Sequence, residues 1–296
     1  MNDVAQALMR ARNSGVDRID AQLLLLHAIG TAPADFGTRR AWLLAHDDEA
    51  VDARAACRFE RYLRRRLAGE PLAYITGYKE FFGLGLGVDA RVLVPRADTE
   101  TLVMWALEVL DGPIAARFAP PTVVLDLGTG SGAIALALKH ARPAIQVDAV
   151  DASLDALKVA CANAARLGLE VQFSHGSWLD QVKRRYHCIV ANPPYVAAED
   201  PHMAALTHEP VVALVSGPDG LQDIRHIIMA AKAHLYEGGW LLVEHGFDQA
   251  ERVGHLFAQA GYRQIGSKVD LGGNTRCTGG SISPTIPVPA ATDPAR

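Results

Sequence analysis

The first part of the chain carries apolar side chains at helical spacing. Between residues 2 and 67 these side chains recur on one face of a helix, so the pattern predicts several amphipathic helices. Asp20 is positioned to cap a helix over residues 23–29, and the acidic residues 47–49 are positioned to begin the next helix. We therefore expect a small helical domain at residues 1–72.

A connecting segment follows the helical pattern. Residues 73–77 and 79–88 are aromatic and β-branched, with glycines between them, and they predict a short hairpin. The hairpin would lie within a linker of residues 73–95. Beyond the linker, Thr99 or Asp98 is expected to cap a helix, because each has a side-chain oxygen that can accept hydrogen bonds from the first backbone N–H groups.

From residue 123 onward, short apolar runs alternate with helical stretches rich in Ala and Leu. This alternation predicts an α/β domain over residues 96–283, with a seven-stranded, mostly parallel sheet covered by helices on both faces. The last two runs are separated by residues 272–274, too short for a helix, so they should pair antiparallel. Residues 284–296 lack an apolar period and are expected to be a disordered tail. The expected strands are residues 123–127, 146–150, 171–174, 188–191, 240–244, 262–269 and 276–282.

The composition excludes several classes of protein. The chain has 296 residues, of which 49% are hydrophobic, enough for a large core. Its formal net charge of -4 is unfavourable for coating nucleic acid, so no direct nucleic-acid partner is expected. No apolar run approaches the roughly 20 residues that span a bilayer, and we expect a cytoplasmic monomer with no membrane partner. The four cysteines lack zinc-ligand spacing and are expected to be buried free thiols, with no metal site.

One of the expected strands runs directly into Asn192-Pro193-Pro194-Tyr195. Two successive prolines fix φ and remove two backbone donors, so the chain must leave the sheet rigidly there. The Asn192 amide and the Pro193 carbonyl would then face a cleft with the Tyr195 ring beside them, an arrangement that suits a planar NH2 group. Residues 199–216 are long and irregular and are expected to wall this cleft. A simple tight turn is the structural alternative for an Asn-Pro pair.

A glycine-rich turn follows the first expected strand of the sheet. Glycines let the backbone turn sharply and let a ligand touch it, but dinucleotide-binding enzymes use a related turn, so the turn alone is weak evidence. Here the spacing differs from theirs and an acid precedes the glycines, which resembles the S-adenosylmethionine loop of class I methyltransferases. The candidate cofactor-binding residues in this turn are Asp126, Gly128, Thr129, Gly130, Ser131 and Gly132.

Two further residues follow the ends of the next expected strands. Asp151 is placed to accept hydrogen bonds from both hydroxyl groups of a ribose, with capping of the following helix as the alternative role. Trp178 could lie along an adenine ring or fill the core. Both residues would lie at the carboxyl edge of the sheet, where ligands of open α/β folds bind.

With these motifs assembled, the chain resembles the glutamine-N5 methyltransferases of class-1 peptide-chain release factors, the PrmC/HemK family. The resemblance extends from the helical start to about Ser283. Two features depart from the family pattern: Ala97 stands where proline is common, and the proline-rich tail is additional. The motifs that carry the resemblance are Gly69-Glu70-Pro71 with Tyr74 and Gly77, Pro95-Arg96 with Asp98-Thr99-Glu100, Asp126 to Gly132, Asn192 to Tyr195, and Glu244-His245-Gly246.

The resemblance implies both a fold and an activity. A class I, Rossmann-like domain would transfer a methyl group from S-adenosylmethionine to the side-chain amide of the glutamine in a Gly-Gly-Gln loop of a release factor. The helical domain would bind that protein substrate. Asn192, Pro193 and Tyr195 would be catalytic, and Pro194 would complete the substrate site. The family's cofactor contacts fall on Gly128 to Gly132, Asp151, Trp178 and Asn192.

Three other functions are compatible with parts of the pattern. Ribosomal-protein L3 glutamine methyltransferases are similar, but the Asp98-Thr99-Glu100 run is what separates the release-factor family from them. The flipped adenine in an adenine-N6 DNA methyltransferase presents an NH2 group of the same geometry to the enzyme, but such an enzyme would need a basic target-recognition domain. A cofactor-binding protein without catalysis would have no need for the intact Asn192 to Tyr195 motif.

Overall fold

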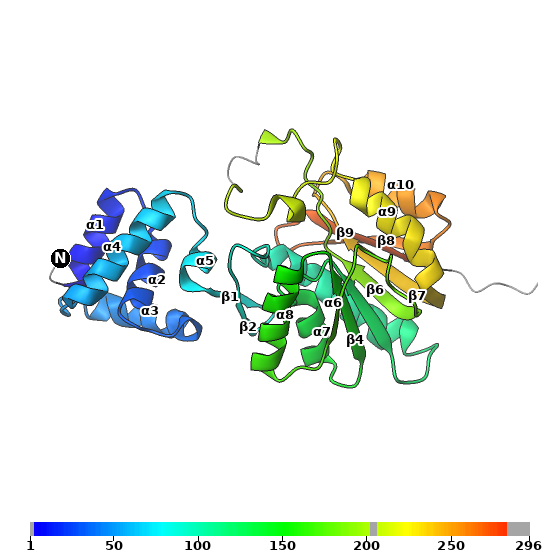
Figure 1. Ribbon diagram of the computed structural model, residues 1–296, viewed down its shortest axis with the longest axis horizontal. Helices are drawn as coiled ribbons and strands as arrows, with labels where there is room; N and C mark the ends of the chain where they lie inside the picture. The colour runs from blue at the N-terminus through cyan, green and yellow to red at the C-terminus, as the bar shows by residue number, and fades with distance from the viewer. Residues whose placement is uncertain (1–2, 202–205, 283–296) are drawn as a thin grey trace, which may run out of the picture.

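The computed structural model describes residues 3–201 and 206–282, which form a small helical part joined to a larger α/β part (Figure 1). In the helical part, α1 to α4 pack around a core of their own that includes the fully buried Leu24, Leu25 and Phe59. The apolar spacing of the sequence accounts for this core, because it places one stripe of each helix inside. The elements of this part are α1 Val4–Asn13, α2 Arg18–Ala28, η1 Pro33–Asp35, α3 Phe36–Ala45 and α4 Ala53–Leu67.

Two helix caps differ from the expectation. Asp17 caps α2 through hydrogen bonds to its carboxylate, whereas Asp20 forms an ion pair with Arg66 of α4 at 2.6 Å. Asp52 caps α4, whereas backbone carbonyls within residues 47–49 accept hydrogen bonds from the first N–H groups of α1. A capping residue must directly precede its helix, so a small error in the start of a helix selects the wrong acid.

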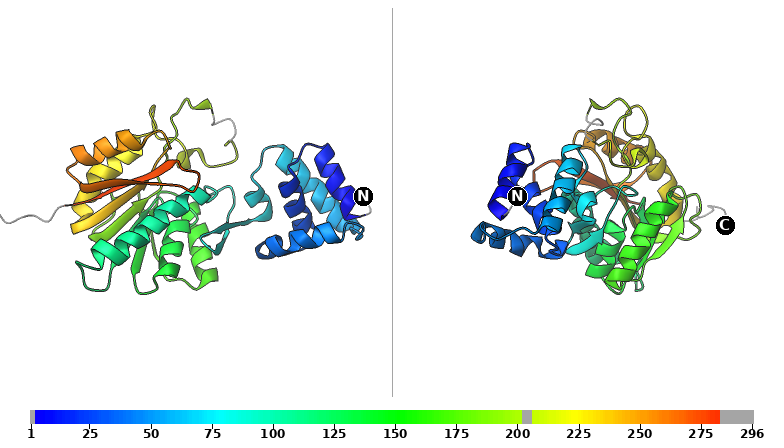
Figure 2. Two further views of the ribbon diagram at one scale, coloured as in Figure 1. Left: turned by 180° about the vertical axis from the view of Figure 1, so that it is seen from behind. Right: turned by 60° about the vertical axis from the view of Figure 1, so that its left-hand side comes forward.

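A short helix and a hairpin connect the two parts (Figure 2). The expectation of hairpin structure at residues 73–77 is wrong, because this stretch forms α5. Pro71 fixes φ at the start of α5, and Gly77, with a φ of 67°, ends it in the left-handed region. The antiparallel hairpin follows directly. These elements are α5 Leu72–Thr76, β1 Tyr78–Phe81 and β2 Leu84–Gly87.

A seven-stranded sheet forms the centre of the α/β part, in the order β5-β4-β3-β6-β7-β9-β8. The first five strands in this order are parallel, and β9 is antiparallel to both of its neighbours. The predicted mostly parallel sheet and the predicted antiparallel final pair are therefore confirmed. The strands are β3 Val123–Leu127, β4 Gln146–Asp151, β5 Gln172–His175, β6 Tyr186–Ala191, β7 Leu235–Glu244, β8 Arg263–Val269 and β9 Thr275–Ser281.

Helices cover both faces of this sheet (Figure 2). Val124 and Val190 face a core that α6 and α7 close, whereas Leu125 and Ile189 face a second core that α9 and α10 close. Adjacent strand residues point to opposite faces, so strands that are apolar throughout are buried on both sides. The helices are η2 Ala97–Thr99, α6 Glu100–Val109, η3 Leu110–Ile114, α7 Ala133–Ala141, α8 Leu154–Leu167, η5 Val211–Ala213, α9 Gln222–Ala231, η6 Lys232–His234 and α10 Ala250–Gln259.

The order of the strands determines where a ligand-binding crevice can open at the edge of the sheet. β3 lies between β4 and β6, so the connections from β3 and β6 leave toward opposite faces of the sheet. In open α/β sheets, such a switch point opens a crevice at the carboxyl ends of the strands. The turn that follows β3 and the Asn-Pro-Pro-Tyr motif that follows β6 both begin at this edge.

The remaining expectations concern the cysteines, membrane-spanning helices and the tail. All four cysteines are free, but the expectation that they are buried is wrong for Cys57 and Cys161, which are exposed on helices α4 and α8. Among the described residues, no helix is both long and apolar enough to cross a membrane. The tail expected to be disordered, residues 284–296, lies outside the described residues.

Candidate active site

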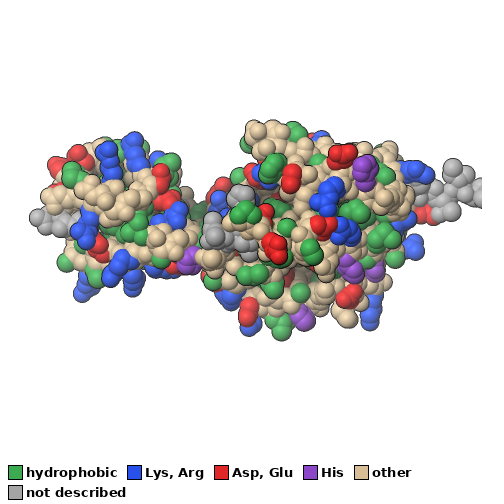
Figure 3. All heavy atoms as spheres, turned by 90° about the horizontal axis from the view of Figure 1, so that it is seen from above, with side chains coloured by type: hydrophobic (Ala, Val, Ile, Leu, Met, Phe, Trp, Pro, Cys, Tyr) green, Lys and Arg blue, Asp and Glu red, His purple; other side chains and the backbone are tan. Residues whose placement is uncertain are grey.

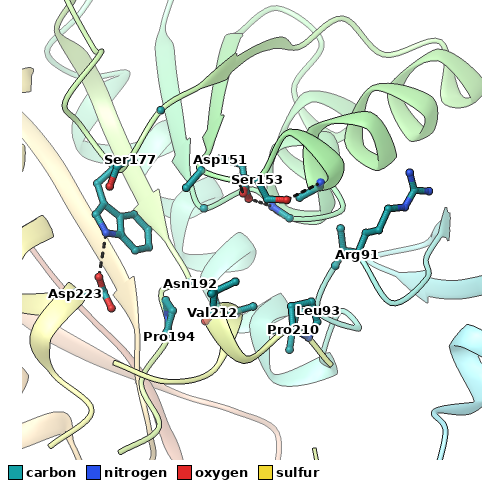
Figure 4. A pocket seen from close by; sticks show the side chains of 18 residues that line it. Arg91, Leu93, Asp151, Ser153, Ser177, Asn192, Pro194, Pro210, Val212 and Asp223 are labelled. Atoms are coloured by element: carbon teal, nitrogen blue, oxygen red, sulfur yellow. Dashed lines mark hydrogen bonds between the residues drawn. The ribbon is translucent and has the colours of Figure 1, made fainter. Parts of the chain in front are cut away.

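A cavity of about 410 Å³ opens at the carboxyl ends of β3, β4 and β6. Asp151 and Ser153 lie on one side of it, Asn192 and Asp223 on another, and Arg91 with the segment around Pro210 closes it toward the linker (Figure 4). Its volume falls in the range of small-molecule sites. It is lined by residues 91–93, Gly128, Gly130, residues 151–153, Ala156, residues 176–178, Asn192, Pro194, Pro210, Val212, Ala213 and Asp223.

The glycine-rich turn presents its backbone to this cavity. Gly128 has a φ of 71°, and a Cβ atom there would lie 3.1 Å from the Trp178 ring, so a larger residue would be both strained and crowded. Gly130 also has a positive φ and donates its N–H to Asp151 Oδ2 at 2.8 Å. The turn is therefore shaped for close approach of a ligand to its main chain.

The other residues of this turn lie behind it. Thr129, Ser131 and Gly132 are not among the described residues that line the cavity, and neither is Asp126, which is fully buried. Asp126 Oδ2 accepts hydrogen bonds from Thr129 Oγ1 at 2.7 Å and from the Ala135 N–H at 3.2 Å. Asp126 therefore braces the turn and the start of α7 from behind, and direct contact of these four residues with the cofactor stays a prediction.

Burial dominates the electrostatics of Asp126. It raises the pKa of the carboxyl group to about 7, while the hydrogen bonds from Thr129 and Ala135 oppose the shift and the nearby Asp151 adds to it. Within the described part of the chain, Asp126 Oδ1 has no hydrogen-bond partner. The native state therefore holds a proton on Asp126 more tightly than the unfolded state does.

This shift predicts a pH-dependent effect of Asp126→Asn. Since the folded pKa is raised, the stabilisation from protonated Asp126 is complete at low pH and is lost as the pH rises toward 7. Relative to the wild type, the variant should therefore be more stable at pH 8 than at pH 5. The change in this difference in the free energy of unfolding should be about 2–3 kcal/mol. Urea unfolding at the two pH values measures it. The exposed control Asp180→Asn should show no such change, and an equal change in both variants would contradict the prediction.

Asp151 connects the turn to the cavity. Its Oδ1 accepts a hydrogen bond from the Ser153 N–H at 2.8 Å, and its Oδ2 accepts the one from Gly130. The N-cap of α8 is Ser153, whose hydroxyl accepts from Ala156 N–H, so the alternative capping role belongs to Ser153 and not to Asp151. Each carboxylate oxygen retains a further lone pair for a ligand in the cavity.

Trp178 forms one wall and is held in place by Asp223. The Trp178 backbone has a φ of 47°, and its indole N–H donates to Asp223 Oδ1 at 3.0 Å. Asp223 Oδ2 accepts a hydrogen bond from the Ser216 hydroxyl at 2.6 Å. The sequence gives no signal for this role of Asp223, because an acid in the first turn of a helix is explained by the helix dipole alone.

Asn192 enters the cavity from the end of β6. Its Nδ2 donates to Thr99 Oγ1 at 3.2 Å, so Thr99 occupies the N-cap position of α6 without capping it. Pro194 also lines the cavity, whereas Pro193 and Tyr195 are not among the described lining residues, so their contact with a substrate stays a prediction. Tyr195 packs against the core that α9 and α10 close, and its backbone carbonyl accepts a hydrogen bond from Gln249 Nε2 at 3.0 Å.

Glu244, at the end of β7, is 1% exposed and lies behind Asn192. Burial raises the pKa of its carboxyl group to about 7, and hydrogen bonds from Thr99 and Asn192 and the charge of Arg276 oppose the shift. Its Oε2 atom has no hydrogen-bond partner among residues 3–201 and 206–282. The sequence singled out Glu244 as part of a family motif but gave it no function.

The segment of residues 199–216 closes one side of the cavity, as expected from its length. Pro210, Val212 and Ala213 line the cavity, with residues 202–205 outside the described range. Glu209 accepts a hydrogen bond from the Val94 N–H at 3.0 Å and pairs with Arg96. His208 contacts the Ala68 carbonyl at 2.9 Å through Nε2. The segment therefore joins the cavity to the linker and to the end of the helical part.

Comparison with known proteins adds family relationships to this geometry. The PrmC N-terminal domain family matches residues 3–77, and the methyltransferase small domain family matches residues 113–217. A release factor glutamine methyltransferase of Coxiella burnetii is 44% identical over 265 residues, which cover 89% of this chain and 91% of that protein. The protein of the same name from Bordetella pertussis is 43% identical over 272 residues, with 90% and 96% covered.

The fold has solved counterparts at lower identity. A methyltransferase from Pyrococcus furiosus aligns with a TM-score of 0.51 at 16% identity, covering 76% of this chain and all (100%) of that one, and supports the fold alone. The curated relatives match both the helical and the α/β parts over nearly their whole length. The chain therefore belongs to the release factor glutamine methyltransferase family.

Proposed function

We propose that this protein transfers a methyl group from S-adenosylmethionine to the side-chain amide nitrogen of the glutamine in a Gly-Gly-Gln loop of class-1 release factors, and that Asn192 orients that amide. Membership of the family supports the reaction class. The observation that carries the assignment of the site is the position of Asn192, which shares one cavity with Gly128, Asp151 and Trp178. A methyl acceptor held by Asn192 would therefore lie next to a cofactor held by the glycine turn.

The cavity lining fits S-adenosylmethionine by its chemistry. Gly128 and Gly130 offer main chain without side chains, Asp151 offers acceptor lone pairs to ribose hydroxyls, and the Trp178 ring offers a flat apolar face to adenine. When bound, the cofactor supplies an electrophilic methyl group. The protein residues have two tasks, to fix the position of that group and to aim the acceptor nitrogen at it.

The acceptor nitrogen needs orientation because its lone pair is delocalised into the carbonyl group. With Asn192 Nδ2 donating to Thr99, Asn192 Oδ1 is the atom left to accept a hydrogen bond from the substrate NH2. The Pro193 carbonyl would accept the second N–H, and together they would fix the direction of the lone pair. A new N–C bond then forms as the S–C bond breaks, and the nitrogen releases a proton. Positioning of this kind supplies roughly 7–11 kcal/mol of a barrier.

No strong base is needed for the last step. An amide nitrogen that has gained a methyl group and still carries both protons is very acidic, so water or the Asn192 oxygen suffices to remove one. We therefore assign no catalytic base. Tyr195 keeps its proposed role as a wall beside the substrate amide, and the hydrogen bond from Gln249 to its backbone carbonyl supports the loop that carries it.

The helical part is suited to hold the rest of a protein substrate. Its core is separate from the two cores of the sheet, and arginine side chains are spread over the face of it that Figure 3 shows. It meets the cavity through the linker and the contact between His208 and Ala68. A substrate bound at both places would gain affinity from the second contact.

Deletion of residues 1–67 tests this second contact. The KM for an intact release factor should rise by about tenfold or more, because the linked contact is lost. The KM for a short Gly-Gly-Gln peptide should stay within about twofold, since such a peptide reaches only the cavity. Circular dichroism must first establish that the truncated protein folds. Equal increases for the two substrates would show that the helical part supports the fold and does not recognise the partner.

A competition of substrates tests the proposed function. Purified protein, labelled-methyl cofactor and equal amounts of release factor, ribosomal protein L3 or DNA would be incubated side by side. We expect label in the release factor at a rate at least about tenfold above the others, the scale on which an enzyme distinguishes substrates by selective contacts. If the label appeared mainly in ribosomal protein L3 or in DNA, that molecule would be the substrate in place of the release factor. If no label were transferred to any of the three, a cofactor-binding protein without catalysis would be favoured.

A further inference from the structure

The orientation of the Asn192 side chain decides whether it can accept a hydrogen bond from a substrate amide. An asparagine side chain carries an acceptor on one side and two donors on the other, and a rotation of its amide group exchanges them. Only the orientation that presents Oδ1 to the cavity can bind a substrate NH2. The reaction therefore requires something that holds the Nδ2 side away from the cavity.

Two buried residues lie on the Nδ2 side of Asn192. Thr99, which is 4% exposed and belongs to η2, accepts from Asn192 Nδ2 at 3.2 Å. Glu244, which is 1% exposed and ends β7, lies close enough to Thr99 and Asn192 for hydrogen bonding from both side chains to lower its pKa. Three segments distant in the sequence thus meet at this point, and a carboxylate oxygen of Glu244 is still without a partner in the described structure.

We propose that Thr99 and Glu244 are positioning residues that hold the Asn192 amide with its oxygen toward the substrate. This inference rests on the proposed function, because the substrate amide gives the orientation its purpose. In this role, neither Thr99 nor Glu244 needs to contact the substrate.

The direction of the hydrogen bonds supplies the physical argument. An ionised carboxylate can only accept, so in a hydrogen bond between Thr99 and Glu244 the Thr99 hydroxyl is the donor. The Thr99 oxygen then has only lone pairs left for Asn192, and it can bond only the Nδ2 side of the amide. A buried hydrogen bond to a charged group is stronger than one between neutral groups, which makes the other orientation unfavourable.

Protonation of Glu244 would remove this constraint. A protonated carboxyl group can donate to Thr99, and the Thr99 hydroxyl can then donate to the Asn192 oxygen and compete with the substrate. Because the pKa of Glu244 is raised to about 7, kcat should fall as the pH falls below 7. Tyr195 and Cys277 have raised pKa values and His245 a lowered one, so in each of the three the shift favours the neutral form. The charged groups that face Glu244 are Asp98 of η2 and Arg276 of β9.

The first test compares two substitutions of Thr99, with a short Gly-Gly-Gln peptide as substrate. Thr99→Ser keeps the hydroxyl and should retain at least about half of kcat, whereas Thr99→Val keeps the shape without the hydroxyl and should lower kcat about tenfold or more. The dissociation constant of S-adenosylmethionine should stay within about twofold in both, because Thr99 is not among the described residues that line the cavity. Equal kcat values for the two variants would overturn the proposal.

The second test uses Glu244→Gln and the dependence of kcat on pH. In the wild type, kcat at saturating substrates should be about tenfold lower at pH 6 than at pH 8, following ionisation of Glu244. A glutamine does not ionise, so the variant should show nearly equal kcat values at the two pH values, and a lower value than the wild type at pH 8. A variant that keeps the wild-type pH dependence would overturn the proposal.

The outcomes separate this inference from the proposed function. If the wild type methylates no glutamine substrate, the proposed function fails. If the wild type is active and Thr99→Val is as active as Thr99→Ser, only the positioning role fails. Thermal melting establishes that each variant is folded. Should Glu244→Gln fail to fold, the Thr99 pair decides the matter, because valine and threonine have the same shape.

Discussion

Asn192→Ala is expected to lower kcat for a Gly-Gly-Gln peptide by about 10²–10³-fold, the usual loss when one oriented hydrogen-bonding group is removed from a reaction site. The substitution deletes the acceptor that faces the cavity and leaves Thr99 Oγ1 without its donor. The KM for the peptide should change less than kcat, because the orientation matters most in the transition state.

Two controls accompany this variant. The affinity for S-adenosylmethionine, measured by calorimetry, should stay within a modest factor of the wild-type value, since most of the cavity lining is intact. The exposed Asn13→Ala, at the end of α1, removes the same group far from the cavity and should leave kcat unchanged. If Asn192→Ala retained more than half of the wild-type kcat, the chemistry would have to be placed elsewhere.

Asp151→Ala is expected to weaken S-adenosylmethionine binding by about 1.5–3 kcal/mol, the scale of losing hydrogen bonds to a charged group. That change is about 10–100-fold in the dissociation constant. The carboxylate fixes the N–H groups of Gly130 and Ser153 and faces the cavity with its remaining lone pairs. Its loss would remove both the ribose contact and the tether of the glycine turn.

Calorimetric titration measures the effect of Asp151→Ala, and two observations distinguish its causes. Asp151→Asn keeps an acceptor for Gly130 and should lose only part of the affinity. For Asp151→Ala, kcat at saturating cofactor should change by less than about threefold, because Asp151 has no part in aiming the acceptor nitrogen. An unchanged dissociation constant with a lowered melting temperature would limit Asp151 to supporting the turn.

The centre of the sheet could be predicted from the sequence because β3 and β6 are short, apolar runs buried on both faces, and helical stretches separate several of the strands. The short spacer at residues 272–274 also predicted correctly that β8 and β9 pair antiparallel. Helix starts were less predictable, because several acids near a helix start can each serve as a cap. The structure uses Asp17 and Asp52, and only the placement of the helix start distinguishes them from their neighbours.

Site residues could be predicted from the sequence where a motif lies next to the end of a strand, because the strand then determines their position. Asp151 ends β4 and Asn192 directly follows β6, and parallel strands end at one edge, so their meeting at one cavity follows from order in the sequence. The supporting contacts do not follow, because they depend on how distant segments pack. Thr99 at Asn192 and Asp223 at Trp178 are such contacts, and neither spacing nor residue type indicates them.

The central claim is that the glutamine side-chain amide is the group methylated and that this chain methylates it. Tandem mass spectrometry of a Gly-Gly-Gln peptide, after incubation with the protein and S-adenosylmethionine, tests this most directly. One added methyl group is expected on the side-chain nitrogen of that glutamine, and none when glutamine is replaced by asparagine or when Asn192→Ala is used for the same short time. An unmodified glutamine, or a methyl group on any other atom of the peptide, would contradict the account.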